Sequence, residues 1–263
     1  MDPWFPVPDN PILRIESLSM RFGGLCALEG VSIEVPQGDI FSLIGPNGAG
    51  KTTLFNCITR MCTPQRGRIL FQEIDLVTLK AHQICALGIT RTFQNVELCS
   101  HLSVLQNLTI GLFSRFEYGL AGSLFLTGAR RSEEKRHRKR LMEVVDFLGL
   151  DACKEYKVSG LPFGLQKVVE LGRALATNPK LVLLDEPASG MNREERDRLT
   201  QILLQTKADL GTTILLVEHD MNFVMNISDR ISVLNFGKKI AEGTPEEVRK
   251  NPSVIEAYLG RGA

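Results

Sequence analysis

The chain has 263 residues, of which 43% are hydrophobic, and its 31 basic side chains are balanced by 30 acidic ones. This length fits a single α/β domain that carries a subdomain. The near-neutral charge argues against nucleic acid as the main partner, because proteins of that class usually carry a basic excess or a basic stripe. The six cysteines include no CxxC pair, which predicts reduced thiols rather than a disulfide framework or a zinc site.

Residues 1–11 are expected to form an extended leader ahead of one domain over residues 12–263. The leader contains four prolines and lacks the basic and then apolar pattern of a signal peptide. Nowhere do about 18 apolar residues follow one another, so the sequence predicts no transmembrane helix.

Residues 12–93 are predicted to form a β-rich first part of the domain, with glycine-containing turns between short strands. The predicted strands are Ile12–Leu18, Val31–Val35, Ile40–Ile44 and Gly67–Phe71. A glycine-rich loop follows the third strand, and Lys51–Thr59 after it is predicted to be a helix.

Residues 94–172 are predicted to be mostly helical, because two sets of apolar residues recur at helical spacing. These sets are Val104, Leu105, Leu108 and Leu112, and Leu141, Val144, Val145 and Leu148. Between them lie the loop Tyr118–Gly128 and the basic run Arg130–Arg140. The basic run is interpreted either as the solvated face of a helix or as a contact for anionic lipid headgroups or an acidic partner.

Residues 173–263 return to alternating strands and helices, which predicts a mostly parallel sheet covered by helices. The predicted elements are the strands Leu181–Leu184, Thr213–Val217 and Ile231–Asn235, the helices Arg193–Leu210 and Met221–Ile227, and two short helices opened by Pro245 and Pro252.

The glycine-rich loop matches the pattern G-x4-G-K-[ST] between a predicted strand and a predicted helix, which is the context that a phosphate-binding loop requires. Its backbone N–H groups and the helix N-terminus would form an anion cradle. Lys51 would add a charge for the β- and γ-phosphates, and the Thr52 hydroxyl would be a ligand for Mg²⁺. The predicted ATP contacts are Gly45, Pro46, Asn47, Gly48, Ala49, Gly50, Lys51, Thr52 and Thr53.

Two adjacent carboxylates end the apolar run Leu181–Leu184. Asp185 is predicted to hold Mg²⁺, directly or through water. Glu186 stands where the chain leaves the sheet and is predicted to orient and deprotonate the attacking water. By itself this pair would also fit an ordinary acidic turn, and the phosphate loop in the same chain favours the catalytic interpretation.

Two further polar residues follow predicted strands. Gln94 is a candidate for contact with Mg²⁺ or with the attacking water. His219 comes after Thr213–Val217. Because the ends of parallel strands meet at one edge of a sheet, His219 is expected near Glu186 and the nucleotide. Either residue alone is more often structural.

In chain order, the phosphate loop, Gln94, a helical insert, LPFGLQ at 161–166, LVLLDEP at 181–187 and EHD at 218–220 resemble the ATP-binding subunits of ABC transporters. The resemblance covers residues 12–259. It implies an α/β P-loop NTPase core with a mostly parallel sheet, an antiparallel β subdomain and an inserted α-helical subdomain, with ATP and Mg²⁺ as cofactors. Residues 12–93 and 173–263 would form the catalytic core, and residues 94–172 the helical subdomain with the signature motif.

The resemblance also implies that two such subunits pack head to tail, with each ATP between the phosphate loop of one and the signature of the other. The signature helix would aim its N-terminus at the γ-phosphate, and the loop Ala188–Asn192 would follow the same interface. Phe22 resembles the family's aromatic residue that stacks on adenine, although a strand-end Phe can also be buried. The residues expected to contact ATP in trans are Leu161, Pro162, Phe163, Gly164, Leu165 and Gln166.

The signature departs from the family's usual LSGGQ. Pro162 replaces the serine whose hydroxyl contacts the γ-phosphate, and Leu165 replaces a polar residue, while backbone N–H groups near Gly164 can still serve. Asn192 stands where the interface loop often has Asp. A signature with Pro and an aromatic residue recurs in subunits for branched-chain amino acids.

The segments 22–28, 88–95 and 242–260 are similar to the first of two ATPases in high-affinity branched-chain amino acid importers. This implies a second ATPase subunit (a paralogue or a second copy), two integral membrane permeases and, indirectly, a periplasmic binding protein. A groove around Gln94 would receive a helix of a permease. The chain would then lie peripherally at the cytoplasmic face of the inner membrane.

Two alternatives remain open. One is the ATPase of an exporter or a lipopolysaccharide-extraction system, although the long insert Leu112–Arg140 favours an importer. The other is a soluble ABC-type ATPase that is not coupled to transport. Proteins of that kind usually carry coiled-coil insertions or two ATPase units, which this sequence lacks.

Overall fold

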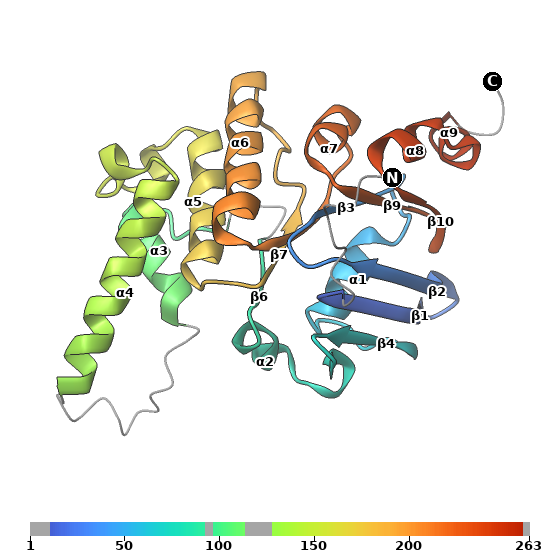
Figure 1. Cartoon of the computed structure of the whole chain (residues 1–263), viewed down its shortest axis with the longest axis horizontal. Helices are drawn as coiled ribbons and strands as arrows, with labels where there is room; N and C mark the ends of the chain where they lie inside the picture. The colour runs from blue at the N-terminus through green and yellow to red at the C-terminus, as the bar shows by residue number, and fades with distance from the viewer. Residues whose placement is uncertain (1–10, 93–96, 114–127, 260–263) are drawn as a thin grey trace, which may run out of the picture.

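The structure is a computed structural model that describes residues 11–92, 97–113 and 128–259. At its centre lies a six-stranded sheet with the strand order β10-β9-β3-β8-β7-β6 (Figure 1). Its strands are β3 (Ile40–Ile44), β6 (Ile89–Arg91), β7 (Leu181–Asp185), β8 (Thr213–Val217), β9 (Arg230–Asn235) and β10 (Lys238–Gly243). Every residue of β3, β7 and β8 is buried, because both faces of this mostly parallel sheet are covered.

A second, antiparallel sheet has the order β2-β1-β4-β5. It consists of β1 (Leu13–Phe22), β2 (Leu25–Val35), β4 (Arg66–Phe71) and β5 (Ile74–Asp75). Its apolar face shares one hydrophobic core with Phe55 of helix α1 (Lys51–Ile58) and with Phe41 and Leu215 of the central sheet. Helix α1 is therefore packed between the two sheets (Figure 1).

Helices α3 (Val104–Phe113), α4 (Gly128–Phe147) and α5 (Phe163–Ala176) form a helical layer on the other side of the central sheet (Figure 1). Leu108, Val144 and Leu148 surround Gly172 of α5, where an added Cβ would lie 2.6 Å from a Leu148 methyl. Glycine therefore allows these three helices to pack closely.

The remaining helices are α2 (Ala81–Ala86), α6 (Arg193–Leu210), α7 (Met221–Ile227), α8 (Pro245–Lys250) and α9 (Pro252–Leu259), with 3₁₀ turns at Leu76–Thr78, Asp151–Cys153 and Val158–Gly160.

The expected fold class is confirmed, with its mostly parallel core, antiparallel β subdomain and inserted helices. The sequence did not predict α2, β5 or β10. Strand β10 is polar and lies at the sheet edge, where it pairs antiparallel with β9 and has little need of an apolar pattern. The expected subdomain boundary at residues 172 and 173 falls inside α5.

The basic run Arg130–Arg140 lies within α4. Lys135, Arg136, Arg138 and Lys139 are exposed, and Arg140 donates to the Leu175 carbonyl oxygen over 3.3 Å. Both interpretations of this run remain predictions. None of the described helices combines the length and apolar composition needed to cross a bilayer. Residues 1–10 of the expected leader 1–11 and residues 118–127 of the expected loop Tyr118–Gly128 lie outside the described residues, and Gly128 begins α4.

Candidate active site

The phosphate loop connects β3 to α1, and its shape depends on two glycines that lie against neighbouring backbone. A Cβ on Gly45, whose φ is +148°, would lie 2.1 Å from the carbonyl oxygen of Leu234. A Cβ on Gly50, whose φ is +105°, would lie 2.5 Å from the carbonyl oxygen of Ala27. Such contacts are shorter than any side chain tolerates, so both positions require glycine.

Lys51 lies in the curl of this loop as the first residue of α1. Its ammonium donates to the carbonyl oxygens of Gly45 over 2.7 Å and of Pro46 over 3.0 Å. Burial lowers the pKa of Lys51, while the nearby carboxylates of Glu186 and Asp185 act in the opposite direction. Lys51 is therefore hydrogen-bonded to the loop and interacts electrostatically with both carboxylates.

Glu186 and His219 come from the ends of neighbouring parallel strands, β7 and β8. Glu186 adopts a left-handed backbone conformation with φ +49°, and its N–H donates to the Val217 carbonyl oxygen over 2.9 Å. Its Oε2 lies 3.7 Å from Nδ1 of His219. The strand-end argument thus places these two residues correctly, and their catalytic roles remain predictions.

Glu218 was given no role in the sequence analysis, yet its carboxylate is 1% exposed and holds the end of β8 to the loop after β7. It accepts hydrogen bonds from the N–H groups of Ala188 over 2.8 Å, His219 over 3.0 Å and Asp220 over 3.4 Å. Burial raises the pKa of Glu218, and these three bonds oppose the rise. The signal in the sequence was a carboxylate placed directly after a buried strand.

Arg91, at the end of β6, is a second residue without a sequence-based role. Its guanidinium donates to Oδ2 of Asp185 over 2.8 Å and to Oδ1 of Asn56 over 2.7 Å. It also lies 5.5 Å from the centroid of the Phe55 ring. Arg91 therefore connects the predicted metal-binding carboxylate to the helix that follows the phosphate loop.

Two other predicted site residues are less closely defined. Phe22 ends β1 and is 49% exposed, so it is not the buried strand-end residue that was the alternative to an adenine contact. Gln94 lies outside the described residues. Its contact with Mg²⁺ or water remains a prediction.

The signature lies at the start of α5, within the helical layer and well apart from α1 (Figure 1). Pro162 is the N-cap residue and supplies no side-chain hydrogen bond to the helix. Leu161 is buried, Phe163 is 44% exposed, and Gln166 donates to the Leu161 carbonyl oxygen over 2.9 Å. The chain therefore carries the phosphate loop and the signature in two separate places.

The oxygen donors near the phosphate loop fit Mg²⁺, which prefers hydroxyl and carboxylate ligands. Thr52 is exposed in the first turn of α1, and Asp185 ends the neighbouring strand β7. Among the described residues, no group of three or more His, Cys, Asp or Glu side chains could hold a metal by itself.

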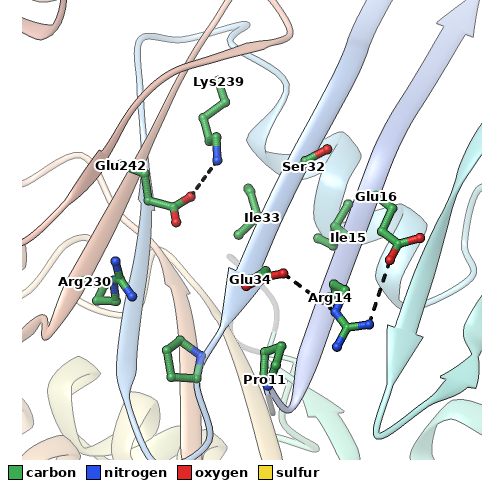
Figure 2. Close-up of a pocket in the computed structure, with 11 residues that line it drawn as sticks. Pro11, Arg14, Ile15, Glu16, Ser32, Ile33, Glu34, Arg230, Lys239 and Glu242 are labelled. Atoms are coloured by element: carbon green, nitrogen blue, oxygen red, sulfur yellow. Dashed lines mark hydrogen bonds and ion pairs between the residues drawn. The ribbon is translucent and has the colours of Figure 1, made fainter. Parts of the chain in front are cut away.

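A separate hollow of about 590 Å³ lies between the β1–β2 pair and the β9–β10 pair (Figure 2). Figure 2 shows ion pairs among several of its charged side chains: Arg14 lies 3.7 Å from Glu34, and Lys239 lies 3.0 Å from Glu242. None of the predicted site residues lines this hollow, and we assign it no role.

Two protein-family models match the chain. The model described as ABC transporter matches residues 28–189, and the model described as Branched-chain amino acid ATP-binding cassette transporter matches residues 238–263.

A curated relative is the high-affinity branched-chain amino acid transport ATP-binding protein LivG of Salmonella typhimurium. It is 43% identical over 251 residues, which cover 95% of this chain and 98% of the relative. Among solved structures, the ADP conformation of an ATP-binding cassette of an ABC transporter is 35% identical, with a TM-score of 0.83 and coverage of 95% and 99% of the two chains. A dimeric post-hydrolysis cassette bound to ADP and Pi is 25% identical, with a TM-score of 0.72 and coverage of 89% and 98%.

Proposed function

This chain belongs to the ATP-binding subunits of ABC transporters, and we propose that it supplies half of each of two ATP sites in a head-to-tail dimer. It is the ATP-hydrolysing subunit of an importer for branched-chain amino acids. The dimeric cassette similar to this chain supports the pairing. The separation of the signature from the phosphate loop supports it as well, because one chain alone holds these two motifs apart.

In the half-site of this chain, the backbone N–H groups of the phosphate loop and the start of α1 bind the phosphates of ATP. Lys51 turns from the carbonyl oxygens of Gly45 and Pro46 to the β- and γ-phosphates. Thr52, Asp185 and Gln94 hold Mg²⁺, and Phe22 stacks on the adenine. When bound, Mg²⁺ neutralises negative charge that develops on the transferred phosphoryl group.

The geometry of Glu186 carries the hydrolytic part of the proposal. Its carboxylate interacts electrostatically with Lys51 and lies 3.7 Å from His219. We assign Glu186 to orient the attacking water and take its proton. His219 holds the carboxylate in place and contacts the γ-phosphate. Leu161, Pro162, Phe163, Gly164, Leu165 and Gln166 of the second subunit complete the site.

A groove of about 400 Å³ between the catalytic core and the helical layer suits the permease partner. It runs past the exposed side chain of Met61 and past Ile84, Arg91 and Ile110. A mostly apolar groove that is also lined by Arg91, Arg173 and Glu170 fits an amphipathic helix. The complete assembly would contain two permeases and a periplasmic binding protein, with this chain peripheral at the cytoplasmic face of the membrane.

The substitution Glu186→Gln tests the catalytic assignment. The variant should bind ATP normally, lose nearly all turnover and accumulate as a nucleotide-bound dimer, whereas Lys51→Ala should lose nucleotide affinity. Near-normal hydrolysis by the Glu186→Gln variant would remove Glu186 from this role.

Purification of this subunit from membranes, followed by uptake of labelled leucine with and without it, tests the role in an importer. Recovery with no membrane protein would contradict it.

A further inference from the structure

Glu195 joins the start of the signature helix α5 to the start of α6. Its Oε1 accepts the N–H of Gly164 over 3.2 Å, and its Oε2 accepts the N–H of Asn192 over 3.0 Å. The Asn192 side chain in turn accepts the Glu195 N–H over 3.0 Å, which completes a capping box on α6. One carboxylate therefore satisfies backbone donors of two helices.

The contact with α5 depends on two features of the signature. A Cβ on Gly164 would lie 2.5 Å from Oε1 of Glu195, so the carboxylate approaches only because this residue is glycine. Pro162 is the N-cap residue and offers no side-chain oxygen to the first N–H groups of the helix. Those donors require an acceptor from elsewhere, and Glu195 supplies it to Gly164.

The proposed in-trans site gives the Gly164 N–H a second acceptor, the γ-phosphate of ATP bound by the other subunit. A carboxylate and a phosphate cannot both occupy one donor, and two anions at that distance repel each other. We propose that Glu195 caps the signature helix while ATP is absent and gives up Gly164 to the γ-phosphate when the dimer closes. This inference rests on the proposed function, whose signature site it deepens.

The change of acceptor at Gly164, from Glu195 to the γ-phosphate, would also affect the interface loop Ala188–Asn192. Glu195 also holds Asn192, the last residue of that loop. At Gly190 of the same loop, an added Cβ would lie 3.0 Å from the Phe163 ring. The loop begins two residues after Glu186, whose carbonyl oxygen accepts the Ser189 N–H over 3.2 Å. Glu195 is thus a positioning residue between the signature and the loop that leads from the proposed general base.

The test compares Glu195→Gln with Glu194→Gln in the assembled transporter. Glutamine keeps the capping box on α6 and removes the charge that opposes the γ-phosphate. Glu194 is exposed on the same helical turn, which makes its substitution a matched charge control. The measurements are the Mg-ATP concentration for half-maximal hydrolysis, the turnover at saturation, and the affinity of the isolated chain for labelled ADP.

We expect Glu195→Gln to lower the half-saturating ATP concentration about fivefold or more, in the range of typical coupling between sites. Turnover at saturation and ADP affinity should not change, because ADP has no γ-phosphate, and Glu194→Gln should behave as wild type. Glu195→Asp, which keeps the charge but is too short to reach Gly164, should give a smaller shift in the same direction.

An unchanged or higher half-saturating concentration in the Glu195→Gln variant would overturn the inference, and so would an equal shift in the Glu194→Gln variant. A separate result bears on the proposed function. If Glu186→Gln abolishes hydrolysis while Glu195→Gln shifts nothing, only the inference about Glu195 fails. If Glu186→Gln hydrolyses ATP normally, the proposed function fails first.

Discussion

Arg91 and Asp185 form an ion pair over 2.8 Å, and each of the two side chains is only 7% exposed. The pair links β6 to β7 and, through Asn56, to the helix after the phosphate loop. Arg91 also lines the groove proposed for the permease, so one side chain contacts both that groove and the predicted metal-binding carboxylate. If the permease binds in that groove as proposed, this connection would give a physical route between the partner and the ATP site.

Replacement of Arg91 by Met should lower the free energy of unfolding by about 3–5 kcal/mol, because it leaves a buried carboxylate without its charged partner. Urea denaturation of the nucleotide-free chain measures this change. The double variant Arg91→Met with Asp185→Asn removes both charges and should regain a large part of the loss. If the two single losses simply add in the double variant, Arg91 and Asp185 do not interact as the structure indicates.

The substitution Gly45→Ala should reduce nucleotide affinity at least about tenfold, equivalent to about 1.4 kcal/mol. The new methyl group would lie 2.1 Å from the Leu234 carbonyl oxygen, so the phosphate loop would have to move. Binding of a fluorescent ATP analogue measures the effect. Gly160→Ala is the control, because a Cβ there meets no atom within 4 Å. Equal affinities of the two variants would show that the loop tolerates the displacement.

The sequence predicts the central elements well where one local signal dominates. Strands β3 and β8 and helices α6 and α7 have the expected bounds, because buried parallel strands are continuous apolar runs and both helices begin at capping side chains, Asn192 and Asp220. The strand-end rule also places His219 near Glu186.

Sequence reasoning misses contacts that depend on residues far apart in the chain. Arg91 and Asp185 are 94 positions apart, and Gly164 and Glu195 are 31 positions apart. No periodicity or motif reports such a pair, because the fold alone decides which elements become neighbours. From the sequence alone, Glu195 at the third position of α6 is predicted only to cap its own helix; its contact with α5 becomes evident only in the structure.

The buried carboxyl group of Glu218 should give the chain a measurable pH dependence. Burial raises its pKa above the ordinary 4.5. A carboxyl group whose pKa is higher in the folded state destabilises that state when ionised, so the cost is present above the raised pKa and is relieved as the pH falls through it. Wild type should therefore gain stability relative to Glu218→Gln as the pH falls from above the raised pKa of Glu218 toward the ordinary 4.5.

The measurement is urea denaturation of both proteins across that pH range. Glutamine cannot ionise. It also disturbs the hydrogen bonds that Glu218 accepts from three N–H groups, so the variant is expected to be less stable by about 1–3 kcal/mol at all pH values. Only the slope of the difference with pH reports the titration. Asp39, whose pKa burial also raises, is present in both proteins and cancels. A difference that does not vary with pH would contradict the assignment.

His219 offers the most direct test of how the hydrolytic residues cooperate. It lies 3.7 Å from Glu186, and its proposed role is to position that carboxylate and the γ-phosphate. His219→Ala should therefore lower kcat by about 100-fold or more, the scale of acid–base contributions, while the KM for ATP changes little. His82→Ala, at an exposed position on α2, should leave both constants unchanged.

Residues that act as one unit do not contribute additively. The double variant Glu186→Gln with His219→Ala should thus be hardly slower than Glu186→Gln alone, because the histidine has no carboxylate left to position. Steady-state kinetics at saturating Mg-ATP distinguishes the cases. If the two losses multiply, His219 acts independently of Glu186, and its role is confined to the phosphate.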